Sequence, residues 1–234
     1  DVQLTGGAAT FDTKDQGTGK TVTLAGAGLV GAKAGNYTLG SVNTTTANIT
    51  AKELAITGLT ASNKVYDGLV AAGLNGTPAL SGVVGTEDVR LTGTAVGAFN
   101  NANVGVNKPV AVTGLSLDGP AKDNYALTLP TLTADITKAP LTVKAEDKSK
   151  TYDGSVYSGG YTVTYAGFVP NETAAVLGGT LTYGGAAATA VNAGSHVITP
   201  AGLTSGNYEI TFANGALTIN KVVLTVTADN AKRA

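Results

Sequence analysis

Alternating apolar and polar residues predict that this chain is built of β-strands. Residues 141–146 read Leu-Thr-Val-Lys-Ala-Glu, and residues 224–228 read Leu-Thr-Val-Thr-Ala. This two-residue period is that of a strand with one buried face. Dipeptides that favour tight hairpin turns separate such runs, at Asp67-Gly68, Asn75-Gly76, Asp118-Gly119, Asp153-Gly154 and Asn214-Gly215. The pattern predicts a mostly β protein made of small antiparallel units.

Helical patterns are short. Residues 170–177 have the composition of a two-turn helix after an Asn or Pro start, and residues 85–89 fit one turn at most. Each unit is therefore expected to be a β-sandwich or a β-grasp-like sheet with at most one short helix.

The chain repeats itself about every 85 residues. The dipeptide Asn-Tyr lies at positions 36, 124 and 207, an Ile in a Thr-rich strand lies at 49, 136 and 219, and Tyr-Asp-Gly begins at 66 and 152. A spacing that holds through three independent anchors indicates internal duplication, which is typical of tandem or stacked units.

These anchors divide the chain into four parts. Residues 1–51 fit the second half of a repeat, 52–137 a complete repeat, 138–220 a second and more diverged repeat, and 221–234 the opening strand of another. We expect a piece of a longer array, because the next Tyr-Asp-Gly is due just past residue 234. We also expect the units to form an elongated rod. The Ala139-Pro140 step is expected to stiffen one junction, since Pro restricts the residue before it to extended backbone.

Composition excludes several classes of function. The 15 Lys and Arg residues nearly balance the 16 Asp and Glu residues, and neither sign is clustered, so no basic stripe for nucleic acid is present. No apolar run approaches the length of a membrane-spanning helix. The absence of Cys excludes disulfides and thiolate metal sites. We expect no cofactor and no enzymatic activity.

The repeat motifs resemble a known family. The segment Lys64–Gly68, Lys-Val-Tyr-Asp-Gly, with the following GVVGTEDVRLTGTAVGAFNNANVGVNKPVAVTG and NYAL, resembles the YDG repeat of large bacterial exoproteins. The segment KAPLTVKAEDKSKTYDG, with the following YAGFVPNETAAVLGGTLTY and NYEITFANGALTINK, is similar to the related MBG repeat. The resemblance implies the stalk repeats of filamentous-haemagglutinin-like adhesins exported by two-partner secretion. It further implies a secreted, cell-surface protein of cell adhesion and biofilms, with neighbouring repeats as partners.

The Tyr-Asp-Gly motifs are interpreted as structural turns. Tyr buries its ring at a strand end, Asp bonds nearby backbone, and Gly takes a conformation that Asp holds only at a cost. The residues are Tyr66, Asp67 and Gly68 in one copy and Tyr152, Asp153 and Gly154 in the other. The alternative is that Tyr and Asp bind sugar.

A second binding hypothesis concerns exposed aromatic side chains. Tyr157, Tyr161, Tyr165 and Tyr183 are candidates for stacking against exopolysaccharide or a host glycan, with 161 and 165 on one face by even spacing. Packing within the sheet is the competing interpretation. In the stalk reading, polysaccharide or a surface receptor would be bound by other regions of the parent protein.

Three further chemistries are weaker hypotheses. Calcium at the junction near residue 139 would use Asp135, Glu146, Asp147 and Asp153, although the acidic spacing is sparse and Lys residues intervene. An isopeptide bond would use Lys64 or Lys144. The single His196 is expected to be a solvated strand residue.

Overall fold

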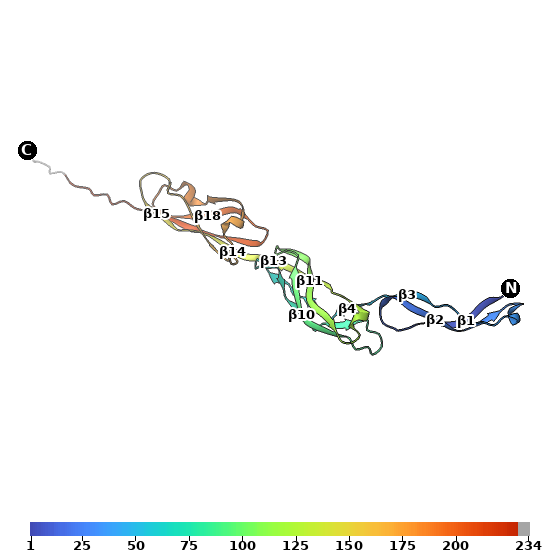
Figure 1. Cartoon of the computed structure of the whole chain (residues 1–234). Coiled ribbons are helices and arrows are strands. Elements are labelled where there is room, and N and C mark those ends of the chain that lie inside the picture. Colours follow the sequence, from blue (N-terminus) through green and yellow to red (C-terminus); the bar gives the residue numbers. More distant parts are fainter. Residues whose placement is uncertain (229–234) are drawn as a thin grey trace, which may run out of the picture. The chain divides into compact units, whose positions relative to one another are not determined.

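The computed structural model describes residues 1–228 and confirms a mostly β chain (Figure 1). In the first half of the chain the strands are β1 (Gln3–Phe11), β2 (Gly17–Val30), β3 (Thr45–Ile49), β4 (Lys52–Thr57), β5 (Thr60–Ala61), β6 (Lys64–Val65), β7 (Ala71–Ala72), β8 (Leu74–Asn75), β9 (Ala79–Ser81), β10 (Arg90–Phe99) and β11 (Gly105–Asp118). The second half contains β12 (Tyr125–Thr128), β13 (Thr131–Thr137), β14 (Ala139–Ala145), β15 (Lys148–Thr151), β16 (Val163–Ala166), β17 (Gly178–Gly184), β18 (Gly194–Thr204), β19 (Tyr208–Ala213) and β20 (Gly215–Asn220).

Helical structure in the described residues is confined to short 3-10 segments, namely η1 (Ala34–Asn36), η2 (Lys122–Asn124), η3 (Ala174–Val176) and η4 (Ala186–Thr189). The two-turn helix expected over residues 170–177 is wrong, since only η3 forms there. Asn171 adopts a positive φ of 68°, which a right-handed helix does not allow, so the segment begins as a turn instead. The Thr173 hydroxyl then accepts a hydrogen bond from the N–H of Ala175 and caps η3.

The chain forms two compact units. Unit 1 contains residues 1–60, 74–97 and 111–132, and unit 2 contains residues 61–73, 98–110 and 133–228 of the described chain. The repeat boundaries predicted from sequence divide the chain differently and remain a prediction. The sheets have the strand orders β1-β2-β3, β12-β4-β9, β5-β8, β6-β13-β11-β10-β7, β16-β14-β19 and β15-β20-β18-β17.

Unit 1 has a small, mostly aliphatic core around strand β4. Leu54 of β4 packs with Val89 and Tyr125, and Ile56 of the same strand packs with Val112 and Leu115. Leu54 and Ile56 are two residues apart, so both point to the same face of the strand. By contrast, the β1-β2-β3 sheet has no buried side chain in the described residues 1–51.

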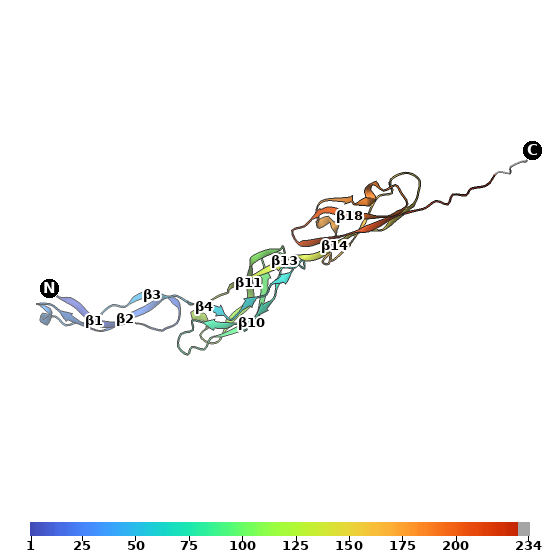
Figure 2. The ribbon, with the colours of Figure 1, turned by 180° about the vertical axis from the view of Figure 1, so that it is seen from behind.

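Unit 2 is organised around the central strand β14, seen from behind in Figure 2. Its residues alternate buried and exposed from Ala139 to Ala145, as the two-residue period of the sequence predicts. β14 pairs with β16 in antiparallel and with β19 in parallel. A second core cluster in this unit contains Ala145, Ala187, Ala190, Ile198, Leu217 and Ile219.

Several strand pairs in the described chain are parallel, which the turn-rich sequence did not indicate. They are β4 with β12, β6 with β13, β14 with β19 and β15 with β20. Each joins strands far apart in sequence, whereas tight turns report only on consecutive antiparallel strands. Asn214-Gly215 also differs from the expected turn. Gly215 does not have a positive φ, and it is required because a Cβ there would lie 2.6 Å from the Ala145 carbonyl oxygen.

No strand forms over residues 221–228, where the alternating pattern of 224–228 predicts one. A strand needs a hydrogen-bonded neighbour, and in the described chain these residues pair with none. The remaining residues of the predicted opening strand, 229–234, lie outside the described residues.

Candidate functional site

The first Tyr-Asp-Gly motif forms a turn that is closed by a lysine. Gly68 has a φ of 76°, and Asp67 Oδ1 accepts a hydrogen bond of 2.9 Å from the N–H of Leu69. Lys64 Nζ donates to Asp67 Oδ1 at 2.7 Å and to the carbonyls of Leu69 and Ala71 at 2.6 and 3.0 Å. The lysine therefore holds the whole loop from residue 67 to 71.

The second Tyr-Asp-Gly motif repeats this arrangement. Gly154 has a φ of 75°, and Asp153 Oδ1 accepts from the N–H of Ser155 at 2.9 Å. Lys150 Nζ donates to Asp153 Oδ1 at 2.6 Å and to the Ser155 carbonyl at 2.7 Å. Sequence reasoning missed this role of Lys64 and Lys150. The signal was available, because each lies three positions before the Asp of its motif.

The two aspartates are held ionised. Hydrogen bonds from Lys150 and from the N–H of Ser155 keep the pKa of Asp153 below its usual range. Burial acts to raise the pKa of Asp67, but the hydrogen bonds from Lys64 and from the N–H of Leu69 outweigh it and lower that pKa. An ionised Asp paired with a largely covered Lys is a charge-assisted contact that stabilises a turn.

Tyr66 differs from the rest of its turn because it contacts a second repeat, within unit 2. Its hydroxyl donates to Oε1 of Glu172 at 2.5 Å, and Tyr208 donates to Oε2 of the same carboxylate at 2.5 Å. The rings of Tyr66 and Tyr208 meet edge to face, with centroids 5.5 Å apart. Tyr208 in turn accepts a hydrogen bond of 3.1 Å from the N–H of Val169. Glu172 therefore links a tyrosine of each repeat.

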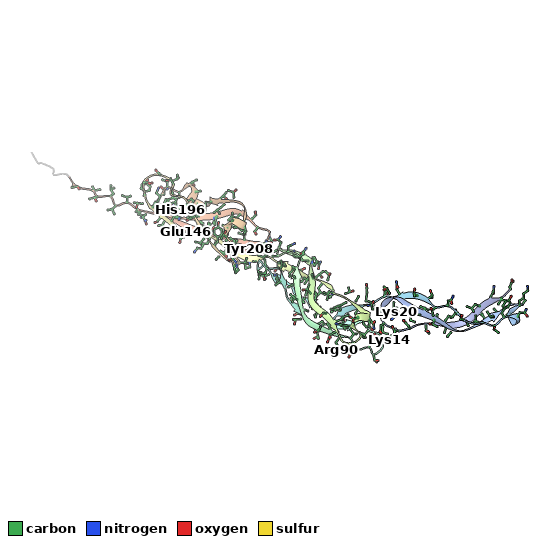
Figure 3. All side chains as sticks on the ribbon, in the orientation of Figure 1. Lys14, Lys20, Arg90, Glu146, His196 and Tyr208 are labelled. Carbon is green, nitrogen blue, oxygen red and sulfur yellow. The ribbon has the colours of Figure 1, made fainter. Side chains whose placement is uncertain are left out.

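Unit 1 contains the same arrangement around Glu87. Tyr125 donates to Glu87 Oε2 at 2.8 Å and accepts from the N–H of Val84 at 3.0 Å. The second carboxylate oxygen of Glu87 accepts from Lys14 (Figure 3), so a lysine here takes the part of second donor that Tyr66 takes at Glu172. In both units the glutamate follows the valine by three positions and bonds the tyrosine of an Asn-Tyr dipeptide.

The asparagines of the second and third Asn-Tyr dipeptides, Asn124 and Asn207, each bind the preceding repeat through both side-chain polar atoms. Asn124 Oδ1 accepts from the N–H of Gln16 at 2.8 Å, and its Nδ2 donates to Asp15 at 3.1 Å. Asn207 Oδ1 likewise accepts from the N–H of Val104 at 3.1 Å, and its Nδ2 donates to Asn103 at 3.1 Å. In both cases the clamped pair directly precedes a long strand, β2 or β11. We call each set of Glu, Tyr and Asn contacts a junction.

The environment of the junctions raises the pKa of their tyrosines. The hydrogen bond to Glu172, together with burial and the nearby negative charge, raises the pKa of Tyr66 to about 12. Burial first and the Glu172 hydrogen bond second raise the pKa of Tyr208. At Glu87, the bonds from Lys14 and Tyr125 lower the pKa of the carboxyl. Since the pKa of Tyr125 is raised as well, the tyrosines of both junctions are neutral hydrogen-bond donors near neutral pH.

Two protein-family models match this chain. The YDG domain matches residues 1–47 and 50–134, more than half of the chain. The chain belongs to the YDG domain family. An MBG domain of the YGX type follows at residues 141–218. Searches of curated proteins and of solved structures found no match.

These assignments confirm the resemblance seen in the repeat motifs. YDG and MBG domains fit a repeat region of a surface protein, and MBG-type domains are typical of extracellular repeat proteins. Neither is a known enzyme family. In terms of these domains, the junction in unit 2 joins Tyr66 of the second YDG match to Glu172 and Tyr208 of the MBG domain.

The four tyrosines considered for glycan stacking lie in the MBG domain and form two groups. Tyr157, Tyr161 and Tyr183 pack against the core cluster around Ile198, and the Tyr161 hydroxyl donates to the Ala187 carbonyl at 3.0 Å. Tyr165 instead packs beside Phe168. β16 begins only at Val163, so the even spacing of 161 and 165 does not place both on one strand. Glycan binding by these residues stays a prediction.

The carboxylates considered for calcium are engaged separately. Glu146 pairs with Lys148 at 3.2 Å, and Asp153 pairs with Lys150. Asp135 accepts from the N–H of Asn107, and Asp147 from the N–H of Ala216. Among residues 1–228 no three acidic, His or Cys side chains gather as metal ligands.

Two smaller expectations concern single residues. His196 lies on β18, with Nε2 2.8 Å from the carbonyl oxygen of Asn192 in its own hairpin (Figure 3). Lys64, considered for an isopeptide bond, is the turn lysine described above. No helix within the described part of the chain is long and apolar enough to cross a membrane.

Proposed function

We propose that these repeats form part of the stalk of a secreted bacterial surface adhesin. Their role is mechanical: they extend a binding region from the cell and resist pulling, in support of attachment and biofilm formation. The family assignment supports this proposal by placing the chain among repeat domains of surface proteins.

The single observation that carries the proposal is the recurrence of the junction. Glu87 and Glu172 each accept from the tyrosine of the Asn-Tyr dipeptide in their own repeat and from one side chain of the preceding repeat. Asn124 and Asn207 each bond the two residues that precede a long strand of that preceding repeat. Binding sites vary with their ligand, whereas a contact repeated at a fixed phase serves the array itself. Directional hydrogen bonds at each junction restrict how one repeat turns against the next, which a stalk requires.

Small-angle X-ray scattering of the 234-residue chain at low concentration tests the proposal. A compact globule of this length has a radius of gyration of about 17 Å. A rod of nearly three units, each about one ten-residue strand long, gives about 30 Å. We expect the larger value. A value near 17 Å would contradict the stalk and direct attention to clefts between folded-back repeats.

Glycan binding by the repeats themselves is the competing function. Packing of Tyr157, Tyr161 and Tyr183 against the MBG core favours the stalk. Retention of the isolated chain on a glycan panel, lost on substitution of Tyr165 and Tyr183 by Ala, would favour binding instead.

A further inference from the structure

A third junction surface exists in unit 2, around the second Tyr-Asp-Gly motif. The N–H of Tyr152 bonds the Asn220 carbonyl at 2.9 Å, as the N–H of Tyr66 bonds the Thr137 carbonyl at 2.8 Å. Asn220 and Thr137 each follow the repeat Ile by one position. The two tyrosines therefore occupy equivalent places, yet Tyr66 is 6% exposed and Tyr152 is 43% exposed.

A third pair of residues lies where the asparagine of an Asn-Tyr dipeptide binds in the other two junctions. Asn192 and Ala193 directly precede β18, just as the clamped pairs Asp15 with Gln16 and Asn103 with Val104 precede β2 and β11. The strand pairing agrees, since Gly194 of β18 lies opposite Ile219 and Gly17 of β2 lies opposite Ile49. Asn192 and Ala193 thus present the groups that an Asn-Tyr dipeptide binds at the other two junctions.

The segment after β20 carries the same pattern as two buried strands. The residue five positions after the repeat Ile is Leu54, Leu141 or Leu224, and these are 0%, 1% and 85% exposed. The residue seven positions after it is Ile56, Val143 or Val226, and Val226 is again the exposed one. An apolar strand face that is buried by a neighbouring sheet in two copies and exposed in the third is a surface that a further sheet can cover.

The register of that partner sheet follows from the two copies. Lys52 pairs with Tyr125 and Ala139 pairs with Tyr208, each three positions after the repeat Ile and each in a parallel ladder. The equivalent residue is Val222. Between this segment and the open junction surface lies a hollow of about 580 Å³, lined by Tyr152, Asp153, Asn192, Ala193 and residues 221–224.

We propose that this face binds a further domain of the YDG or MBG kind, through an Asn-Tyr dipeptide and a Val-x-x-Glu turn of that domain. The glutamate of the partner accepts from the Tyr152 hydroxyl, and its asparagine binds Asn192 Oδ1 and the N–H of Ala193. The partner strand that starts at its tyrosine pairs in parallel with the chain from Val222, which covers Leu224 and Val226. This inference rests on the proposed role of the junctions in joining repeats.

The test extends the intact chain by a known partner. A copy of residues 152–220 is joined directly to residue 234, which keeps the spacing between the repeat Ile and the next Tyr-Asp-Gly within the observed range. Tyrosine nitration mapped by mass spectrometry then reports Tyr152. We expect its nitration rate to fall about sevenfold, the ratio of the exposed fractions of Tyr152 and Tyr66. Hydrogen exchange over residues 222–228 should slow by at least ~100-fold as the strand is paired.

A matched variant separates docking from mere proximity. It carries Glu172→Gln and Asn207→Ala in the appended copy only, where they do not touch the existing junction. We expect the nitration rate of Tyr152 to recover toward its value in the unextended chain. The equivalent of Ile198 lies in the core cluster away from these substitutions, so slow exchange of its strand shows that the copy is folded.

Three results would overturn the proposal. The first is a nitration rate of Tyr152 that does not change although the appended copy is folded. The second is an appended copy that stays unfolded, because residues 221–228 would then not serve as its first strand. The third is protection of Tyr152 from nitration in the unextended chain, increasing with protein concentration. That result would assign this face to binding a second copy of the chain. None of these depends on the radius of gyration, so failure here is distinct from failure of the stalk proposal.

Discussion

Removing the carboxylate of Glu172 should separate the tyrosines of the unit 2 junction. Glu172 receives the hydroxyls of Tyr66 and Tyr208, both at 2.5 Å, and both tyrosines are buried. In Glu172→Ala these hydroxyls lose their charged acceptor. Tyr208 keeps only the bond that it accepts from the N–H of Val169.

The size of the effect follows from the number of bonds lost. A hydrogen bond to a charged group contributes about 1.5–3 kcal/mol, and a polar group at the rim recovers part of this from water. We therefore expect Glu172→Ala to lower the free energy of unfolding by about 2–4 kcal/mol. Glu172→Gln keeps one acceptor oxygen and should cost about 1–2 kcal/mol, as should Tyr66→Phe.

Denaturant unfolding followed by circular dichroism measures the loss, and hydrogen exchange of residues 64–71 and 169–177 localises it. Glu209→Ala is the control for Glu172→Ala, because Glu209 is exposed on β19 of the same unit. Tyr37→Phe is the control for Tyr66→Phe, because Tyr37 is 61% exposed. Both controls should stay within about 0.5 kcal/mol of the unchanged chain.

The decisive comparison is a double-mutant cycle. If Tyr66 and Glu172 interact as described, Tyr66→Phe and Glu172→Gln together cost less than the sum of their separate effects, by about 1 kcal/mol or more. Additive losses, or a Glu172→Ala variant as stable as Glu209→Ala, would refute the Glu172 contact as the bond between repeats.

Three further predictions concern pH, the turn lysine and salt. The pKa of Tyr66 is raised from 10.0 to about 12, so the neutral form of Tyr66 favours the folded state. Its contribution to the free energy of unfolding, about 1–2 kcal/mol after solvent screening, is complete below pH 10 and is lost between about pH 10 and 12. Alkaline unfolding titrations of Tyr66→Phe should lack this loss. Lys64→Met removes the donor to Asp67 and two carbonyls and should cost about 1–3 kcal/mol in denaturant, whereas Lys33→Met should not, because Lys33 is exposed; equal costs would contradict the turn role. Raising NaCl from about 0.05 to 1 M screens the ion pair of Lys14 with Glu87, because the Lys14 side chain is 72% exposed, and should speed hydrogen exchange of residues 84–87. Exchange of residues 169–172 should not change. Lys14→Met should abolish the salt effect at residues 84–87.

Local sequence signals account for several strands and turns of this chain. The alternation in residues 141–146 predicts one buried face, and the structure buries Leu141, Val143 and Ala145 on it. Gly68 and Gly154 follow an aspartate in a short polar loop, where positive φ is common, and both have it. These features depend on neighbours within a few residues, which is the range that a periodic pattern or a turn dipeptide describes.

The junctions depend on pairs that are distant in sequence, and no local pattern reveals them. From sequence, Glu87 and Glu172 lie only in short helix-like segments, at residues 85–89 and 170–177. The available signal was the shared Val-x-x-Glu spacing, with the glutamate 38 residues before Tyr125 in one repeat and 36 before Tyr208 in the other. An acidic residue that recurs at nearly the same distance before a recurring tyrosine is a signal that the two belong to one repeated structural feature.

The chemistry of the junction explains how unlike repeats can share one array. The following repeat supplies the constant parts, a glutamate, a tyrosine and an asparagine, while the donor from the preceding repeat is Lys14 at Glu87 and Tyr66 at Glu172. Either donor satisfies the second carboxylate oxygen, so the acceptor tolerates a change of neighbour. An apolar contact allows many relative orientations of two repeats. Here the carboxylate accepts on both oxygens, and the asparagine bonds through its oxygen and its nitrogen. All of these hydrogen bonds form together in one orientation only. Both preceding repeats match the YDG domain, whereas the following repeat is a YDG domain at Glu87 and an MBG domain at Glu172, so the same junction residues allow either kind of domain to follow a YDG repeat in one array.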